Sequence, residues 1–205
     1  MYDCIIFDVD GTMIDNEKAV FSSYQKVIYD EFGRHFTPEE IKRAYAVPTH
    51  EALIRLGLKN IREAEEKYHK YLMEAFCHVE PFTGIPDVLD YLRRREVILG
   101  VVTSRNQNEV SEDVCFQGLA HHFKHVVCAN DTEKHKPNPE PLLKLLQQAD
   151  CESYKTLYIG DTIYDFQCAR NAGVDFALAT WGAKNREGIE AKYFLKEPGE
   201  ILGIL

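Results

Sequence analysis

The stretch Cys4-Ile5-Ile6-Phe7-Asp8-Val9-Asp10-Gly11-Thr12 decides the fold of this chain. Its first four residues are apolar at successive positions, which is typical of a parallel strand with both faces covered. The strand runs into two aspartates at positions i and i+2, so both carboxylates project to the same side. Gly11 then permits a tight exit from the strand. Ligands bind at the carboxyl ends of strands in open α/β sheets, and this end is therefore a candidate active site.

Similar apolar runs recur along the chain and predict a mainly parallel sheet. Further buried strands are expected at residues 97–102, 125–128, 156–159 and 176–179. Helical patterns alternate with them, at residues 87–94, 108–116, 140–148 and 164–172. This alternation of strand and helix predicts the α/β fold class.

Residues 16–79 interrupt the alternation, because they show helical patterns and no convincing strand. Thr37-Pro38-Glu39-Glu40 combines a capping box with proline at the first helical position, so a helix should begin there. Other helices are expected before Gly33, from 49 to 56 before Gly57, and from about 60 to 76. We expect residues 15–80 to form an all-helical domain, inserted after the first strand of a core made of residues 1–14 and 81–205.

The composition excludes several classes of partner. The chain has 205 residues, with 33 acidic against 24 basic side chains and a net charge of −9. This acidic surplus argues against nucleic acid or an anionic membrane as the main ligand. The longest apolar run is too short to cross a bilayer, and the N-terminus lacks the basic region of a signal peptide. The six scattered cysteines have no zinc spacing, so we expect reduced thiols and a cytoplasmic location.

Two acidic pairs predict a metal site. Asp8 and Asp10 repel each other, and a hard cation such as magnesium relieves that repulsion. Asp161 follows the strand predicted at 156–159, and Asp165 lies one helical turn later on the same face. Asp161 or Thr162 could instead serve only as the cap of the next helix. The presence of both pairs favours metal coordination.

Two further segments are suited to an anion. Thr103-Ser104-Arg105 ends a predicted strand and offers hydroxyl groups and backbone amides. Lys136, in Lys134-His135-Lys136-Pro137-Asn138-Pro139, lies between a predicted strand and a helix, and lysine binds phosphate oxygens as a compact charge. Taken alone, Thr103 could be a helix cap and Lys136 a solvated charge.

These four segments, in this order, resemble the four motifs of the haloacid dehalogenase superfamily. The helical insert and the closing Pro81-Phe82-Thr83-Gly84 resemble the phosphoglycolate phosphatase/β-phosphoglucomutase branch, which carries a helical cap. Thr180-Trp181-Gly182 and residues 196–201 are also similar to that branch. The resemblance covers essentially the whole chain, and it implies a Rossmann-like core with an all-helical cap.

The resemblance implies a magnesium-dependent phosphatase that hydrolyses a small phosphorylated metabolite through an aspartyl-phosphate. Asp8 would be the nucleophile, and Asp10 would protonate the leaving oxygen and later deprotonate water. A nucleophile must be ionised whereas a general acid must hold a proton, so the chemistry requires two carboxyl groups with separate roles. The implied metal ligands are Asp8, the backbone carbonyl of Asp10, Asp161 and Asp165. The implied ligands of the phosphoryl group are Thr103, Ser104 and Lys136.

Other activities stay open at this stage. Sugar-phosphate mutases of this branch commonly use an arginine in the cap, but the corresponding segment here, Ala46-Val47-Pro48-Thr49-His50-Glu51, has none. A phosphonate hydrolase would need a suitably placed cap lysine, for which only Lys42 and Lys59 are candidates. The candidate cap contacts to substrate are Arg43, His50 and Arg55.

A phospho-acceptor signalling module or a non-catalytic binding protein would belong to a different class. Receiver domains also place an aspartate, a hydroxyl residue and a lysine at strand ends, but they lack the helical insert and have no use for Asp10. The expected partner is a small phosphorylated metabolite, with no nucleic acid and no membrane. The expected assembly is a monomer or a homodimer.

Overall fold

A computed structural model of the chain describes residues 2–44, 47–76 and 79–205. Its strands form a six-stranded sheet in the order β3-β2-β1-β4-β5-β6, and every pair of neighbouring strands is parallel. The strands are β1 (Cys4–Phe7), β2 (Ile98–Val102), β3 (His125–Val127), β4 (Thr156–Gly160), β5 (Asp175–Ala179) and β6 (Tyr193–Leu195). The predicted α/β class with a parallel, Rossmann-like sheet is confirmed. The strand order reverses between β1 and β4, where such sheets open a crevice at their carboxyl ends.

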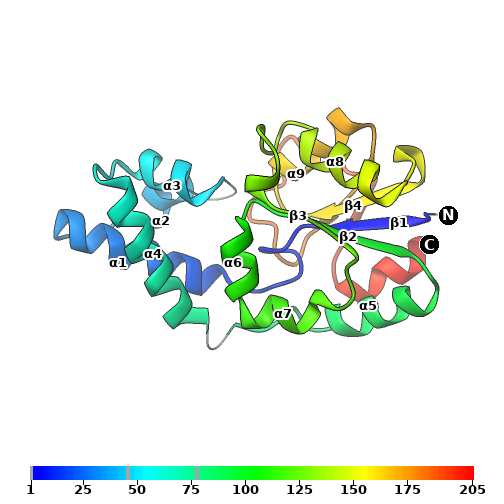
Figure 1. Ribbon diagram of the computed structural model, residues 1–205, viewed down its shortest axis with the longest axis horizontal. Helices are drawn as coiled ribbons and strands as arrows, with labels where there is room; N and C mark the ends of the chain where they lie inside the picture. Colours follow the sequence, from blue (N-terminus) through cyan, green and yellow to red (C-terminus); the bar gives the residue numbers. More distant parts are fainter. Residues whose placement is uncertain (1, 45–46, 77–78) are drawn as a thin grey trace.

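Helices cover both faces of the sheet (Figure 1). On one face lie α5 (Ile85–Arg94), α7 (Val114–Ala120) and the C-terminal 3-10 helix η3 (Pro198–Ile204), and on the other lie α8 (Glu140–Ala149) and α9 (Ile163–Ala172). Side chains alternate along β1, so Ile5 and Phe7 pack with the α5 face while Cys4 and Ile6 pack with the α8 face. All four are fully buried, which explains why this strand is apolar at every position.

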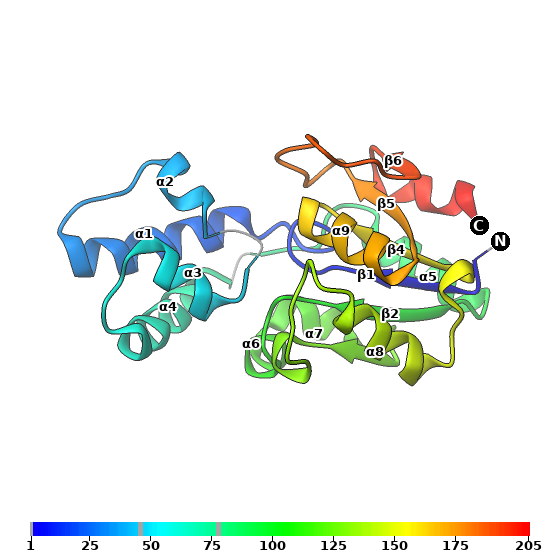
Figure 2. The same ribbon diagram turned by 90° about the horizontal axis from the view of Figure 1, so that it is seen from above.

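A separate helical lobe lies beyond one end of the sheet (Figure 2). It contains α1 (Glu17–Phe32), α2 (Pro38–Lys42), α3 (Thr49–Leu56) and α4 (Ile61–Phe76). The lobe has an apolar core of its own, in which Tyr24 stacks on Tyr68 with 4.5 Å between ring centroids. The predicted capping box is present at Thr37, and α1 and α3 end at glycines with φ of 66° and 87°.

The structure differs from the sequence predictions in the helix expected at 108–116 and in one edge strand. The single helix predicted at 108–116 is two helices, α6 (Gln107–Glu112) and α7, because Asp113 is extended between them. The Asp113 carboxylate accepts a hydrogen bond from the backbone N–H of Phe116 and so begins the second helix. The edge strand β6 was not predicted, since three residues are too few to show a periodic pattern.

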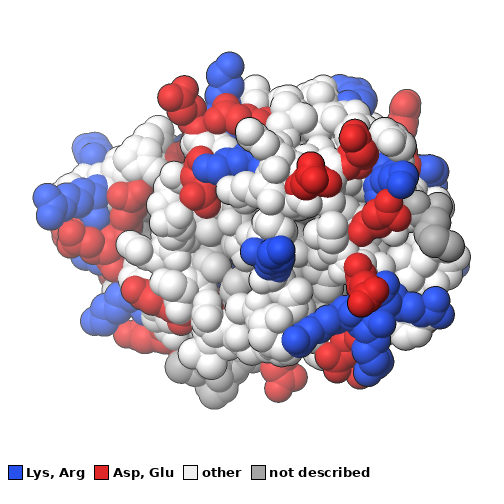
Figure 3. Space-filling view, turned by 45° about the vertical axis from the view of Figure 1, so that its right-hand side comes forward, with Lys and Arg blue, Asp and Glu red and all other residues white. Residues whose placement is uncertain are grey.

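The surface and the thiols agree with an ordinary folded chain. Acidic and basic side chains are interspersed on the face drawn in Figure 3, so the acidic surplus forms no continuous patch there. Within the described residues, five cysteines are free, as predicted, whereas Cys77 lies outside those residues. In the same part of the chain, no helix is both long and apolar enough to span a membrane.

Candidate active site

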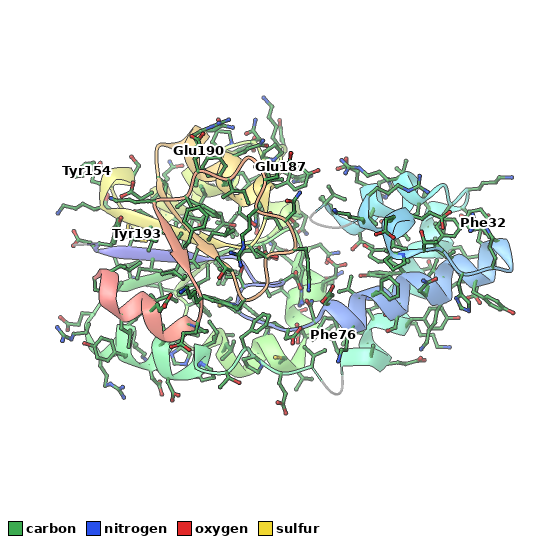
Figure 4. The ribbon with its side chains drawn as sticks, turned by 180° about the vertical axis from the view of Figure 1, so that it is seen from behind. Phe32, Phe76, Tyr154, Glu187, Glu190 and Tyr193 are labelled. Atoms are coloured by element: carbon green, nitrogen blue, oxygen red, sulfur yellow. The ribbon has the colours of Figure 1, made fainter. Side chains whose placement is uncertain are left out.

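A pocket of about 780 Å³ lies between the helical lobe and the carboxyl ends of β1 and β4. Both lobes line it, and Figure 4 shows Phe76 where they meet and Glu187 on the facing rim of the α/β lobe. The pocket contains six of the residues predicted for the site: Asp8, Asp10, Ser104, Lys136, Asp161 and Asp165. The seventh, Thr103, is 3% exposed and does not line the pocket.

Asp8 is held in place by the end of β1. Its backbone N–H donates to the carbonyl of Ile159 at 2.9 Å, which extends the pairing of β1 with β4 by one residue. The carboxylate is buried and accepts a hydrogen bond from Lys136 Nζ at 2.7 Å. Burial raises the pKa of Asp8 from 3.8 to about 7; Lys136 opposes this shift, and the nearby Asp165 adds to it. This carboxylate is therefore costly to ionise without a further cation.

Asp161 and Asp165 come from the turn between β4 and α9. Thr162 is the N-cap of α9: its hydroxyl accepts from the backbone N–H of Asp165, and the Asp165 carboxylate accepts from the backbone N–H of Thr162. The capping interpretation is thus right for Thr162, but it does not exhaust the role of Asp165, whose other oxygen accepts from Lys136 at 2.8 Å. Gly160 is required beneath this turn, because a Cβ there would lie 2.5 Å from the Cβ of Asp165.

Asp8, Asp161 and Asp165 form a cluster that could hold a metal ion. Each offers a carboxylate oxygen, these oxygens lie within 4.8 Å of one another, and all three residues are buried. Burial, together with repulsion from Asp165 and Asp8, raises the pKa of Asp161 well above its ordinary value. Hard divalent cations prefer carboxylate oxygens, so this donor set fits magnesium. The Asp10 carboxylate does not belong to the cluster.

Lys136 bridges two members of the cluster. Its Nζ lies 2.7 Å from Asp8 and 2.8 Å from Asp165, and its side chain is 5% exposed. Burial alone would lower the pKa of Lys136, but the two carboxylates raise it above its usual range. The lysine therefore stays charged inside the site, and the alternative of a solvated surface lysine is wrong.

Asp10 points to a different cation, Arg105. The Arg105 Nε lies 3.0 and 2.9 Å from the two Asp10 oxygens, and one terminal nitrogen lies 2.5 Å from Asp10 Oδ1. The side-chain amide of Asn16 also donates to Asp10. Asp8 and Asp10, only two residues apart, thus contact different cations.

The structure contradicts the alternative that Thr103 caps the helix after β2. Asn106, not Thr103, is the N-cap of α6. The Thr103 hydroxyl instead accepts from the backbone N–H of Arg105 at 3.2 Å, which closes a tight turn. Ser104 and Arg105 line the pocket from this turn.

The candidate contacts of the helical lobe divide into two groups. Arg43, Arg55 and Lys42 line the pocket. Neither His50 nor Lys59 does, and His50 pairs with Glu65 at 3.0 Å. The loop compared with mutases begins at Ala46, which lies outside the described residues. Its Thr49 hydroxyl donates to Glu109 of the α/β lobe at 2.8 Å.

Sequence reasoning assigned no role to several residues that build the site. The Tyr158 hydroxyl donates to Asp165 at 2.8 Å, and Trp181 Nε1 donates to the carbonyl of Thr12 at 2.9 Å. Gly182 lies so close to the loop after β1 that a Cβ there would be 1.7 Å from the Gly11 carbonyl oxygen. Gly182, just after a buried strand, was the one available signal, because a glycine can mark a place where another backbone approaches closely.

Known proteins share this architecture. The family model for haloacid dehalogenase-like hydrolases matches residues 5–179, which include every predicted site residue. A pyrophosphatase PpaX of Bacillus cereus is 26% identical over 205 residues, covering 98% of this chain and 95% of that relative. A crystal structure from Lactobacillus plantarum, of a protein assigned by prediction as a phosphoglycolate phosphatase, matches 100% of both chains at 27% identity with a TM-score of 0.90.

A more distant structure shares the fold. CbbY from Rhodobacter sphaeroides, crystallised in complex with phosphate, is 17% identical and has a TM-score of 0.86. The match covers 98% of this chain and 96% of that one. The arrangement of the elements is thus kept where little of the sequence is shared.

Proposed function

The chain belongs to the haloacid dehalogenase-like hydrolase family and is a phosphatase, and from this premise we propose that it hydrolyses a small phosphorylated metabolite with magnesium, through a phosphorylated Asp8. The observation that carries the proposal is the buried cluster of Asp8, Asp161 and Asp165 with Lys136 between two of its members. Such a cluster combines a nucleophile, a cation site and a fixed positive charge at the crevice of the sheet.

In the first step, an oxygen of Asp8 attacks phosphorus. A bond forms between this oxygen and phosphorus while the bond from phosphorus to the leaving oxygen breaks, and the proton of Asp10 passes to the leaving oxygen. Lys136 already touches Asp8 at 2.7 Å, so its charge lies where the phosphoryl oxygens arrive. A fixed charge there stabilises the negative charge that develops on them.

In the second step, water attacks the phosphorus of phosphorylated Asp8. Asp10 takes the proton from water, and the bonding pair between phosphorus and the Asp8 oxygen returns to the carboxylate. Asp10 lies two residues beyond Asp8 and lines the same pocket, which supports this role. Acid and base catalysis of this kind contributes about 10²- to 10⁴-fold to the rate.

The proposed magnesium ligands are Asp8, the backbone carbonyl of Asp10, Asp161 and Asp165. When bound, magnesium would neutralise charge on the carboxylates and on the phosphoryl oxygens. The raised pKa values of Asp8 and Asp161 support this assignment, since burial disfavours both ionised carboxylates and a bound cation would favour them.

We also propose that residues 15–80 act as a cap that selects the substrate. The pocket extends between the two lobes, and Lys42, Arg43 and Arg55 line it from the cap. Hydrolysis is favoured over phosphate transfer within a sugar bisphosphate, because the loop at 46–51, where mutases commonly carry arginine, has none. Thr103 and Ser104 are proposed to hold phosphoryl oxygens at the end of β2.

A phosphate-release assay over a panel of substrates tests this proposal. The panel includes p-nitrophenyl phosphate, a sugar phosphate and a nucleoside monophosphate. Pyrophosphate and phosphoglycolate are added because relatives carry those activities in their names. We expect release with magnesium, none with EDTA, and none from Asp8→Asn at matched concentration. Unchanged turnover by Asp8→Asn would show that the reaction does not pass through this carboxylate.

A further inference from the structure

Arg105 is an almost fully buried arginine at the wall of the pocket. Its side chain is 9% exposed, and its guanidinium contacts two carboxylates, those of Asp10 and Asp113. Burial alone would lower the pKa of Arg105, but the two carboxylates raise it above its usual value. Such an arginine keeps its charge and has a fixed place.

The contact with Asp10 fixes both the position and the orientation of that carboxylate. Nε lies 3.0 and 2.9 Å from the two Asp10 oxygens, and a terminal nitrogen lies 2.5 Å from Oδ1. A planar guanidinium presents its donors in a rigid fork that matches a carboxylate, whereas a lysine ammonium is a rotatable point charge. The fork therefore restricts rotation of the Asp10 carboxylate about its own axis.

Asp113 fixes the opposite side of the same guanidinium. It accepts a hydrogen bond from the other terminal nitrogen of Arg105, and it is 1% exposed. Asp113 is also the extended residue that separates α6 from α7 and begins α7 through its other oxygen. The break in the helix thus places a buried carboxylate behind Arg105.

A ring of the helical lobe covers the face of the guanidinium. Phe76, the last residue of α4, lies with its ring centroid 5.0 Å from Arg105 Cζ. Figure 4 shows Phe76 at the junction of the two lobes. Arg105 is therefore held by one carboxylate behind it and one ring beside it, and its Nε and one terminal nitrogen donate to Asp10.

We propose that Arg105 is a positioning residue that fixes the Asp10 carboxylate for proton transfer, with Asp113 as the anchor of Arg105. The inference rests on the proposed function, because it assumes that Asp10 exchanges protons with the leaving group and with water. Proton transfer requires the acid or base within hydrogen-bond reach, and a displacement of about 1 Å can cost about 100-fold in rate. In this proposal Arg105 acts only through Asp10.

The test compares Arg105→Lys with Asp113→Asn in the full-length protein with magnesium. Lysine keeps the charge but loses the fork. Asparagine keeps an acceptor for the cap of α7 but loses the charge that anchors Arg105. Arg95→Lys is the matched control, since Arg95 also lies over a ring, at 5.2 Å from Tyr91, but on the exposed end of α5. Thermal melts establish that each variant is folded.

The assay uses p-nitrophenyl phosphate and measures kcat, KM and the fraction of enzyme trapped as phosphoenzyme by acid quench. p-Nitrophenolate leaves without a proton, so the first step depends little on Asp10, whereas attack by water depends on it fully. We expect Arg105→Lys to lower kcat by 10- to 100-fold, to change KM less than threefold and to raise the phosphoenzyme fraction several-fold. Asp113→Asn should change the same quantities in the same direction by a smaller factor, and Arg95→Lys should match the wild type.

Two results would overturn the positioning role of Arg105. One is a kcat of Arg105→Lys within threefold of the wild type. The other is a lower kcat without accumulation of phosphoenzyme, because a merely structural loss of active protein does not move the balance between the two steps. Failure of the proposed function is distinguishable from both, since the wild type itself would then form no phosphoenzyme.

Discussion

The burial of Asp8 predicts that replacing this proposed nucleophile by asparagine stabilises the magnesium-free protein. The pKa of Asp8 is about 7 in the folded chain and close to 3.8 in the unfolded chain. Between these values the folded state holds a proton that the unfolded state has released, so the stability of the folded state falls as pH rises through this window. Each unit of pH costs about 1.4 kcal/mol, for a total of at most about 4 kcal/mol above pH 7.

Asparagine has nearly the shape of a protonated aspartate and carries no charge, so Asp8→Asn removes this cost. The gain over the wild type should be near zero at pH 4, should grow through pH 5 and 6, and should level off above pH 7. Its plateau is bounded by the same figure of about 4 kcal/mol. The difference should follow the window between pH 3.8 and about 7, because titrating groups that do not contact Asp8 contribute equally to both proteins.

Urea unfolding in EDTA at pH 5, 6, 7 and 8, followed by circular dichroism, measures the difference. Asp87→Asn is the control, since Asp87 is exposed in the first turn of α5 and solvated in both states. Magnesium should reverse the ranking, because a ligand that binds only the folded state stabilises it by RT ln(1 + [L]/Kd) and the variant lacks one ligand. A difference that is flat with pH, or a variant less stable than the wild type at pH 8, would refute the electrostatic account of Asp8.

Three further perturbations give defined outcomes. Lys136→Met should destabilise the fold by about 3–5 kcal/mol in urea titrations, because the carboxylates of Asp8 and Asp165 lose their buried cation; a loss under 1 kcal/mol would contradict the buried pairing. Gly182→Ala should lower the melting temperature and abolish phosphatase activity, because its Cβ would overlap the Gly11 carbonyl, whereas Gly118→Ala in α7 meets no atom within 4 Å and should leave both intact. Magnesium binding at pH 6, followed by calorimetry in two buffers of different ionisation enthalpy, should release protons and weaken as pH falls, since the ion displaces protons from the buried carboxylates; identical heats in both buffers would argue against protonated ligands.

Local signals in the sequence were sufficient for most of the fold. The apolar runs were continuous because the strands are covered on both faces, and they located five of the six strands. Capping chemistry also acts within a few residues, so the start at Thr37 and the stop at Gly33 were predictable. The helix break at Asp113 was not, because aspartate is tolerated inside helices and its role here depends on Arg105.

The geometry of the site shows the limit of such reasoning. The four segments could be assigned to one sheet edge, since parallel strands bring their carboxyl ends together. Which side chains of these segments pair with one another could not be predicted. Arg105 and Asp10, for example, are 95 residues apart in sequence and meet only through packing. The contact of Gly182 with the loop after β1 is equally non-local. Side-chain partners of this kind leave no periodic pattern in the sequence.

Asp8 and Asp10 lie in one short motif, and their different charged neighbours explain how they can have different chemical properties. Asp8 shares Lys136 with Asp165, and Asp161 forms no ion pair within the described chain, so three buried carboxylates have one cation among them. Asp10, on the same stretch of chain, pairs with Arg105, which also pairs with Asp113. The first group is short of positive charge and is therefore suited to a divalent ion, while Asp10 lies outside that group, contacts a different cation and is the carboxyl group proposed to move protons. Asp8 and Asp10 have only one residue between them, and at the end of a strand each of the two carboxylates can face a separate cation. The net charge of −9 does not reveal this arrangement. The chemistry depends on which carboxylates the two buried cations, Lys136 and Arg105, contact.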